Sequence, residues 1–124
     1  MLTAIIEKVS GIPYEQFLQE CIFKPIQLKN TGLDNGRTVV KNLATGHSVW
    51  KEVIQTEFVD MSIPQGAYGL YSTAEDLCKW AMSLKDGTLL GEQLLKKMFT
   101  SYLGGYGYGW FIGDSSRQAS IRVI

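Results

Sequence analysis

One short segment of this 124-residue chain has the residue types and spacing of an activated nucleophile. Ser48 is followed three residues later by Lys51, and a lysine close to a serine can help to remove the hydroxyl proton before acyl transfer. Residues three apart lie on one face, one turn apart, in a helix but not in a strand. Because the residues up to Val49 have the pattern of a strand, we reject Ser48 as a catalytic nucleophile.

The other nucleophilic and metal-binding side chains are too few or too scattered to form a site. His47 is the only histidine and no Gly-x-Ser-x-Gly elbow accompanies it, so we predict a strand histidine with a satisfied ring, not a triad member. Residues 113–116, Gly-Asp-Ser-Ser, faintly resemble the nucleophile block of another esterase class but are interpreted as a turn, because no helix follows. Cys21 and Cys78 occupy apolar positions of expected helices and are interpreted as buried thiols. We predict no catalytic residue, no metal ligand and no cofactor.

The amino-acid composition argues against some classes of binding partner. Twelve basic and twelve acidic residues cancel, and no block of like charge indicates binding to nucleic acid or to an anionic membrane. Small or neutral partners fit better. No apolar run approaches the roughly 18 residues of a membrane span, and the opening residues reach Glu7 and Lys8 too soon for a signal peptide. We therefore predict no membrane span, and the sequence gives no indication of compartment.

Two helices are predicted near the N-terminus, and we expect them to pack as a pair. The first is indicated by Leu2, Ile5, Ile6 and Val9 and should end at Gly11. It has no capping residue before it, which suggests that the natural chain continues upstream. The second should begin near Pro13 and stop before Pro25. Its apolar stripe comprises Tyr14, Phe17, Leu18, Cys21 and Ile22.

The next part of the chain has an extended pattern. Turn residues stand at 30–32 and 34–36, and short β-prone runs lie around 39–40 and 44–49. We interpret them as two short strands or a loose ribbon. Residues 51–62 show no clear period, and residues 64–66 are predicted to form a surface loop.

A well-specified helix follows this loop. Ser72 and Glu75 have the spacing of a capping box, in which the hydroxyl and the carboxylate satisfy amides of the first turn. The predicted buried face comprises Leu77, Trp80, Ala81 and Leu84, and Asp86-Gly87 should end the helix. A shorter amphipathic helix is indicated by Leu94, Leu95, Met98 and Phe99.

Glycines alternate with aromatic and apolar residues from 105 to 112. The pattern predicts a strand with one aromatic face and one nearly bare face. The same glycines lack the spacing and the context of a phosphate-binding loop.

Several segments form one ordered pattern that is more specific than any single motif. They are Ala-Ile-Ile-Glu-Lys-Val-Ser-Gly at 4–11, Tyr-Glu-Gln-Phe at 14–17, Ile-Phe-Lys-Pro-Ile at 22–26, Asn-Thr-Gly at 30–32, Ala-Thr-Gly-His-Ser at 44–48, residues 66–80, and Tyr-Gly-Tyr-Gly-Trp at 106–110. Together they resemble the penicillin-recognising serine hydrolases, which group class C-type β-lactamases, D-alanyl-D-alanine carboxypeptidases and related esterases. Residues 115–124 match no part of this pattern.

The resemblance implies an α+β fold of the β-lactamase/DD-peptidase type, of which this chain would be a mainly helical fragment with a few short antiparallel strands. Residues 1–124 would form a single unit, the middle portion of a larger serine hydrolase domain. The family's S-x-x-K, Y-x-N or S-x-N, and K-T-G or H-x-G motifs are absent, apart from the rejected segment at 48–51. We therefore expect the chain alone to be inactive.

The resemblance also implies what the parent enzyme would do. It would act by acyl transfer through a serine ester on a peptidoglycan D-Ala-D-Ala peptide, a β-lactam or a small ester, and an extracytoplasmic location is implied. Tyr68 would be its substrate-binding residue, because the matching Ala-Tyr-Gly of class C-type β-lactamases places an aromatic ring on the pocket wall. Many carboxypeptidase-like relatives have glycine there, and a buried or lid-packing tyrosine is the alternative.

A different class of function is a non-catalytic binding or self-assembly module on the same scaffold. Under either interpretation, a chain that is only part of a domain exposes the apolar face against which the rest of the domain would pack. We therefore expect the fragment to self-associate.

Overall fold

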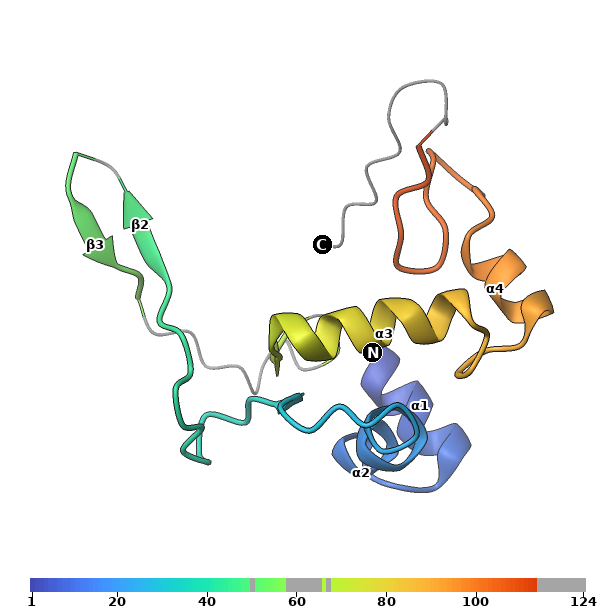
Figure 1. Ribbon diagram of the computed structural model, residues 1–124, viewed down its shortest axis with the longest axis horizontal. Coiled ribbons are helices and arrows are strands. Elements are labelled where there is room, and N and C mark those ends of the chain that lie inside the picture. Colours follow the sequence, from blue (N-terminus) through green and yellow to red (C-terminus); the bar gives the residue numbers. More distant parts are fainter. Residues whose placement is uncertain (50, 58–65, 67, 114–124) are drawn as a thin grey trace. The chain divides into compact units, whose positions relative to one another are not determined.

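The computed structural model describes residues 1–49, 51–57, 66 and 68–113. The chain divides into two compact units, Met1–Lys79 and Trp80–Ile124, with the boundary inside the longest helix, so each unit is described by itself (Figure 1). The described elements are helices and short antiparallel strand pairs. The predicted α+β class, mainly helical with a few short strands, is therefore confirmed.

The first unit opens with the predicted pair of helices. Helix α1 spans Leu2–Ser10 and ends at Gly11, whose φ of 76° is left-handed and whose amide donates to the Glu7 carbonyl at 2.8 Å. Helix α2 spans Tyr14–Leu18, and the Tyr14 amide donates to Glu7 Oε1 at 2.9 Å. Glu7 therefore links the end of α1 to the first turn of α2, and the two helices contact each other (Figure 1).

A π-helical turn continues α2 and changes which residues are buried. Helix η1 spans Gln19–Phe23, and the Lys24 amide donates to the Gln19 carbonyl five residues back, at 3.0 Å. This wider turn moves burial to Phe23, while Cys21 is exposed. The interpretation of Cys21 as a buried thiol was therefore wrong. The apolar core of the unit comprises Leu18, Phe23, Ile26, Leu28 and Leu33.

Two antiparallel strand pairs lie in the first unit. Strands β1 (Gly32–Leu33) and β4 (Leu70–Tyr71) pair across a long sequence separation. Strands β2 (His47–Val49) and β3 (Val53–Gln55) form a hairpin, green in Figure 1. The strand ending at Val49 was predicted, whereas 39–40 are not a strand and β3 was missed. Both hairpin strands are exposed on both faces, so their sequences carry no alternation of apolar and polar residues.

Helix α3 spans Ala74–Lys85 and starts one residue later than predicted. Thr73, not Ser72, is the N-cap: its carbonyl accepts the Leu77 amide at 2.9 Å and its Oγ1 accepts the Asp76 amide at 3.3 Å. The predicted box of Ser72 and Glu75 is therefore wrong by one residue. The C-terminal end was predicted correctly, since Gly87 has a φ of 69°.

The predicted apolar face of α3 also needs correction. Leu84 is buried and Trp80 half-buried as expected, but Leu77 is 55% exposed and Cys78 is exposed. Asp76 and Ser83 are buried instead. The buried stripe thus runs through 76, 80, 83 and 84, which lie at helical spacing on a face that carries polar groups.

The second unit is organised around stacked indole rings. The rings of Trp80 and Trp110 lie 5.5 Å apart with an angle of 8° between their planes, and Phe99 contacts Trp110 at 5.3 Å between centroids. Phe99 is the C-cap of α4, which spans Glu92–Met98, where the sequence predicted a short amphipathic helix. Trp110 is buried and lies in the loop that returns from α4.

Residues 105–112 do not form the predicted strand. Gly104, Gly105 and Gly109 have φ of 62°, 77° and 76°, which no extended strand adopts. The loop is held by tight turns, in which the Gly107 amide donates to the Trp110 carbonyl at 2.8 Å. Within the described residues only isolated bridges involve this segment, joining Tyr106 to Leu103 and to Phe111. These three glycines therefore lie in turns and not in a strand.

Candidate site around Tyr68 and Asp76

Tyr68, the predicted substrate-binding residue, lies at the entrance to β4 and is 63% exposed. It stands next to Gly69, whose φ of 85° is left-handed and strains any residue with a side chain. On its other side, Gly66 packs so closely against α1 that an added Cβ would lie 2.6 Å from Thr3 Oγ1. Tyr68 therefore lies between Gly66, where close packing favours glycine, and Gly69, where the backbone conformation favours it.

The strand pair β1–β4 connects Tyr68 to the rest of the unit. Gly32 faces Tyr71 and Leu33 faces Leu70, and the ladder continues with the Asp34 amide donating to the Gly69 carbonyl at 2.6 Å. The Tyr71 ring lies directly over Gly32, where an added Cβ would come within 2.6 Å of Tyr71 Cζ. Glycine at position 32 is thus required by close packing and not by its backbone conformation.

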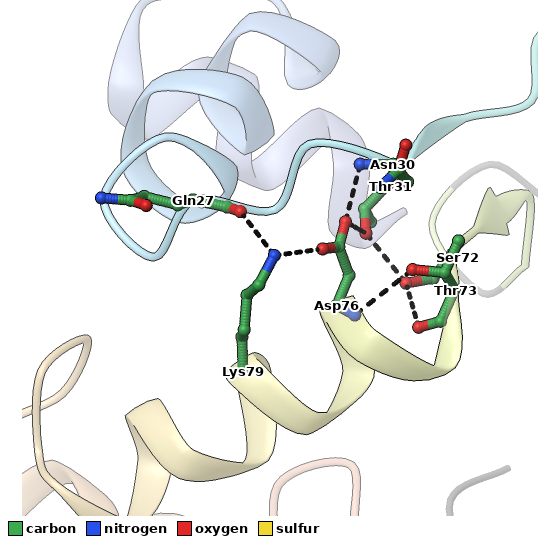
Figure 2. Close-up of polar contacts among 7 residues, drawn as sticks. All are labelled: Gln27, Asn30, Thr31, Ser72, Thr73, Asp76 and Lys79. Atoms are coloured by element: carbon green, nitrogen blue, oxygen red, sulfur yellow. Dashed lines mark hydrogen bonds and ion pairs between the residues drawn. The ribbon is translucent and has the colours of Figure 1, made fainter.

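A buried carboxylate closes the opposite end of this ladder. Figure 2 shows Asp76 in the first turn of α3, with its carboxylate directed at the chain just before β1. Asp76 Oδ2 accepts the Asn30 amide at 2.7 Å and the Thr31 hydroxyl at 3.0 Å, while Oδ1 accepts Lys79 Nζ at 2.8 Å. We call the connected set the Asp76 cluster; its members are Gln27, Asn30, Thr31, Ser72, Thr73, Asp76 and Lys79.

The remaining contacts tie three segments together. Lys79 Nζ also donates to the Gln27 carbonyl at 3.1 Å, and the Thr31 and Ser72 hydroxyl oxygens lie 2.8 Å apart (Figure 2). Thr31 immediately precedes β1 and Ser72 immediately follows β4. The cluster therefore holds the two strand ends together at the start of α3.

The electrostatics of the cluster keep Asp76 ionised. The hydrogen bond from Lys79, followed by those from the Asn30 amide and the Thr31 hydroxyl, lowers the pKa of the Asp76 carboxyl below its ordinary value, against the opposing effect of burial. The carboxylate has no exposed surface, while the Lys79 side chain is 44% exposed. This is a buried anion whose Oδ2 is satisfied by two donors from the segment before β1 and whose Oδ1 is satisfied by Lys79, one turn along α3.

An open groove of about 490 Å³ lies beside the cluster in the same unit. Lys29 and Asn30 form one part of its lining, residues 40–44 another, and Tyr71, Ser72 and Thr73 a third. The lining combines amide, hydroxyl and ammonium groups with apolar side chains, so it suits a small polar ligand.

The other candidate residues that the structure describes are not members of the Asp76 cluster. Ser48 lies in β2, so its predicted strand position is confirmed, and Lys51 lies in the following turn with a φ of 43°, so the two residues do not share a helix face. His47 lies in β2, as predicted, opposite Gln55. Of the segment 113–116, only Gly113 is among the described residues. Across the part of the chain that is described, no group of three or more His, Cys, Asp or Glu side chains could hold a metal ion.

A model of the beta-lactamase family matches residues 1–121. The chain belongs to the beta-lactamase family. Among its relatives, the putative penicillin-binding protein PbpX of Bacillus subtilis (strain 168) is 32% identical over 118 residues, covering 94% of this chain and 30% of the relative. A beta-lactamase of Escherichia coli (strain K12) is 32% identical over 111 residues, covering 90% of this chain and 28% of the relative.

A solved structure supports the same family fold. The octameric penicillin-binding protein homologue from Pyrococcus abyssi superposes with a TM-score of 0.68 at 29% identity, covering 88% of this chain and 27% of that chain. This beta-lactamase-family chain therefore spans about three tenths of the length of these relatives. None of the helices described in it is long and apolar enough to cross a membrane.

Sequence reasoning missed the Asp76 cluster of this beta-lactamase-family chain, although two signals were present. Residues 72–76 contain two overlapping candidate N-caps, and the second, Thr73, is the one whose hydroxyl accepts the amide three residues on, at Asp76. Asp76 also lies at helical spacing from Trp80 and Leu84, so a charged residue stood on an otherwise apolar stripe. A charge in such a position indicates a specific buried partner.

Proposed function

We propose that residues 1–124 are the middle portion of a serine hydrolase domain that acts by acyl transfer on a peptidoglycan peptide, a β-lactam or an ester. One observation carries the proposal: the family match extends over residues 1–121, yet the chain spans only about three tenths of its relatives. The family relationship supplies the reaction class, and the relatives' names, a penicillin-binding protein and a beta-lactamase, support the substrate classes.

The 124-residue chain alone is inactive under this proposal. Its only Ser-x-x-Lys segment has the serine in a strand, where the lysine is not held one helical turn away. The nucleophile, the proton relay and the oxyanion-binding groups of the complete domain come from outside residues 1–124. This chain contributes a scaffold and part of the substrate pocket.

Tyr68 is the residue of this chain that contacts substrate. Its ring is 63% exposed and its backbone is fixed by Gly69 and by the β1–β4 ladder. An exposed aromatic ring on a fixed backbone suits the wall of a pocket, because it offers a rigid apolar surface with a polar tip.

A chimera provides the test. The segment of the Escherichia coli relative that matches this chain is replaced by the matching residues of this chain, and hydrolysis of a chromogenic cephalosporin, a p-nitrophenyl ester and a D-Ala-D-Ala peptide is measured. We expect hydrolysis of at least one substrate by the chimera and none by the 124-residue chain. Ser48→Ala should leave the chimera's rate unchanged, whereas Tyr68→Ala should raise KM.

The alternative is a non-catalytic binding or self-assembly module. The octameric relative and the exposed apolar residues of α1, namely Leu2, Ile5 and Val9, support self-association. A chimera that folds and binds substrate analogues but hydrolyses none of the three substrates would favour the module. Light scattering of the isolated chain tests self-association separately, and a monodisperse monomer would contradict it.

A further inference from the structure

The strand pair that carries Tyr68 is too short to fix its own register. Each strand contributes two residues, and an isolated two-stranded pair is marginal even when it is longer. A slip of one residue would turn each side chain of β4 to the opposite face. The orientation of everything attached to β4 therefore depends on contacts beyond the ladder.

Those contacts come from the Asp76 cluster. Asp76 Oδ2 accepts hydrogen bonds from the Asn30 amide and the Thr31 hydroxyl, and the Thr31 hydroxyl is hydrogen-bonded to that of Ser72. The residue just before β1 is therefore held next to the residue just after β4, at the end of the ladder nearest α3. From there the pairs run Gly32 with Tyr71 and Leu33 with Leu70. The next hydrogen bond, from the Asp34 amide to the Gly69 carbonyl, ends beside Tyr68.

We propose that Asp76 is a positioning residue, which sets the register of β1 against β4 through Thr31 and Ser72 and thereby orients Tyr68. The functional half of this inference rests on the proposed role of Tyr68 at the substrate pocket. The structural half does not, because register can be observed in the 124-residue chain without any activity.

The structural experiment uses NMR of the 124-residue chain. Cross-strand nuclear Overhauser effects between Gly32 and Tyr71 and between Leu33 and Leu70 report the register in the unmodified chain. Asp76→Asn and Thr31→Val should each lose or shift these signals, and Thr31→Ser should retain them. Glu75→Gln is the matched control, because it removes an exposed carboxylate from the same helical turn.

Each outcome decides the structural half. Unchanged cross-strand signals in both Asp76→Asn and Thr31→Val would overturn it. If Asp76→Asn fails to fold, shown by loss of the dispersed methyl signals of Leu18 and Leu28, the milder Thr31→Val decides, since valine keeps the shape and removes only the hydroxyl. Signals lost equally in Glu75→Gln would also overturn it, because charge and not geometry would then be responsible.

The functional half is tested in the chimera. Thr31→Val should lower kcat/KM by up to about 100-fold, chiefly through KM, because displacing a positioning group by about 1 Å can have that effect. Combined with Tyr68→Ala it should add nothing further. A loss confined to the concentration of active enzyme, with KM unchanged, would indicate a structural role only and would overturn this half. An inactive unmodified chimera would instead count against the proposed function, while the NMR result would still stand.

Discussion

The carboxylate of Asp76 accepts the backbone amide of Asn30 at 2.7 Å across 46 residues of sequence. This contact joins the first turn of α3 to the segment that enters β1. The carboxylate is fully buried, so the loss of its donors would leave a buried charge unsatisfied and would lower the free energy of unfolding.

The identity of the N-cap of α3 leads to the first prediction. Thr73→Ala should destabilise the chain by about 1 kcal/mol, because the Asp76 amide loses its hydroxyl acceptor. Urea unfolding followed by circular dichroism measures the change. Glu75→Ala is the control and should change the free energy of unfolding by no more than a few tenths of a kcal/mol. A larger loss from Glu75→Ala than from Thr73→Ala would restore Ser72 and Glu75 as the capping pair.

The depressed pKa of Asp76 predicts how stability depends on pH. The folded-state pKa lies below the unfolded value of about 3.9, so the unfolded chain binds more protons as the pH falls through this range. The stabilisation is therefore complete well above pH 4 and is lost as the pH falls through the folded-state pKa. Urea midpoints measured from about pH 2 to about pH 7 give the profile, because this range includes the titration of the carboxyl.

Asp76→Asn provides the comparison for that profile. The variant should have a lower urea midpoint than the unmodified chain at neutral pH, and the difference should shrink as the medium is acidified. Lys79→Met should also lower the midpoint at neutral pH, because it removes the first of the groups that stabilise the carboxylate. A difference between Asp76→Asn and the parent that grows on acidification would contradict the assignment.

The stacked indoles of the second unit give a third prediction. Trp110→Ala should destabilise that unit by roughly 3 to 5 kcal/mol, since it removes a buried ring that contacts both Trp80 and Phe99. Near-ultraviolet circular dichroism should lose the signal of the coupled indoles. Leu103→Ala, in the same loop but 86% exposed, should stay within about 0.5 kcal/mol of the parent.

Replacing a glycine of the 105–112 loop by alanine tests the conformation of the loop, because a loop and a strand predict opposite changes in the free energy of unfolding. Gly109→Ala should destabilise the chain by about 1 to 2 kcal/mol, because alanine is strained at a φ of 76°. If residues 105–112 were a strand, alanine would be neutral or stabilising there. Gly113→Ala is the control, since its backbone is not left-handed and no atom lies within 4 Å of an added Cβ. Thermal unfolding of both variants decides between loop and strand.

The sequence alone determined the elements whose signals are local. Helix α1 and its end at Gly11, the start of α2 near Pro13, the end of α3 at Gly87 and the position of α4 all follow from apolar spacing and from glycine or proline at the boundaries. The strand nature of Ser48 was also readable, and with it the absence of a catalytic helix at that serine.

Only the tertiary structure decided the features that depend on distant partners. The π-helical turn moved burial from Cys21 to Phe23, and the return of the loop onto Trp80 turned an apparent strand at 105–112 into turns. Thr73 was chosen over Ser72 as the cap because the next acidic residue, Asp76, reaches Asn30 and Thr31 far back in the chain. The physical reason is common to all of these: local propensities differ by about 1 kcal/mol or less, and a buried charge or aromatic ring with a distant partner outweighs them.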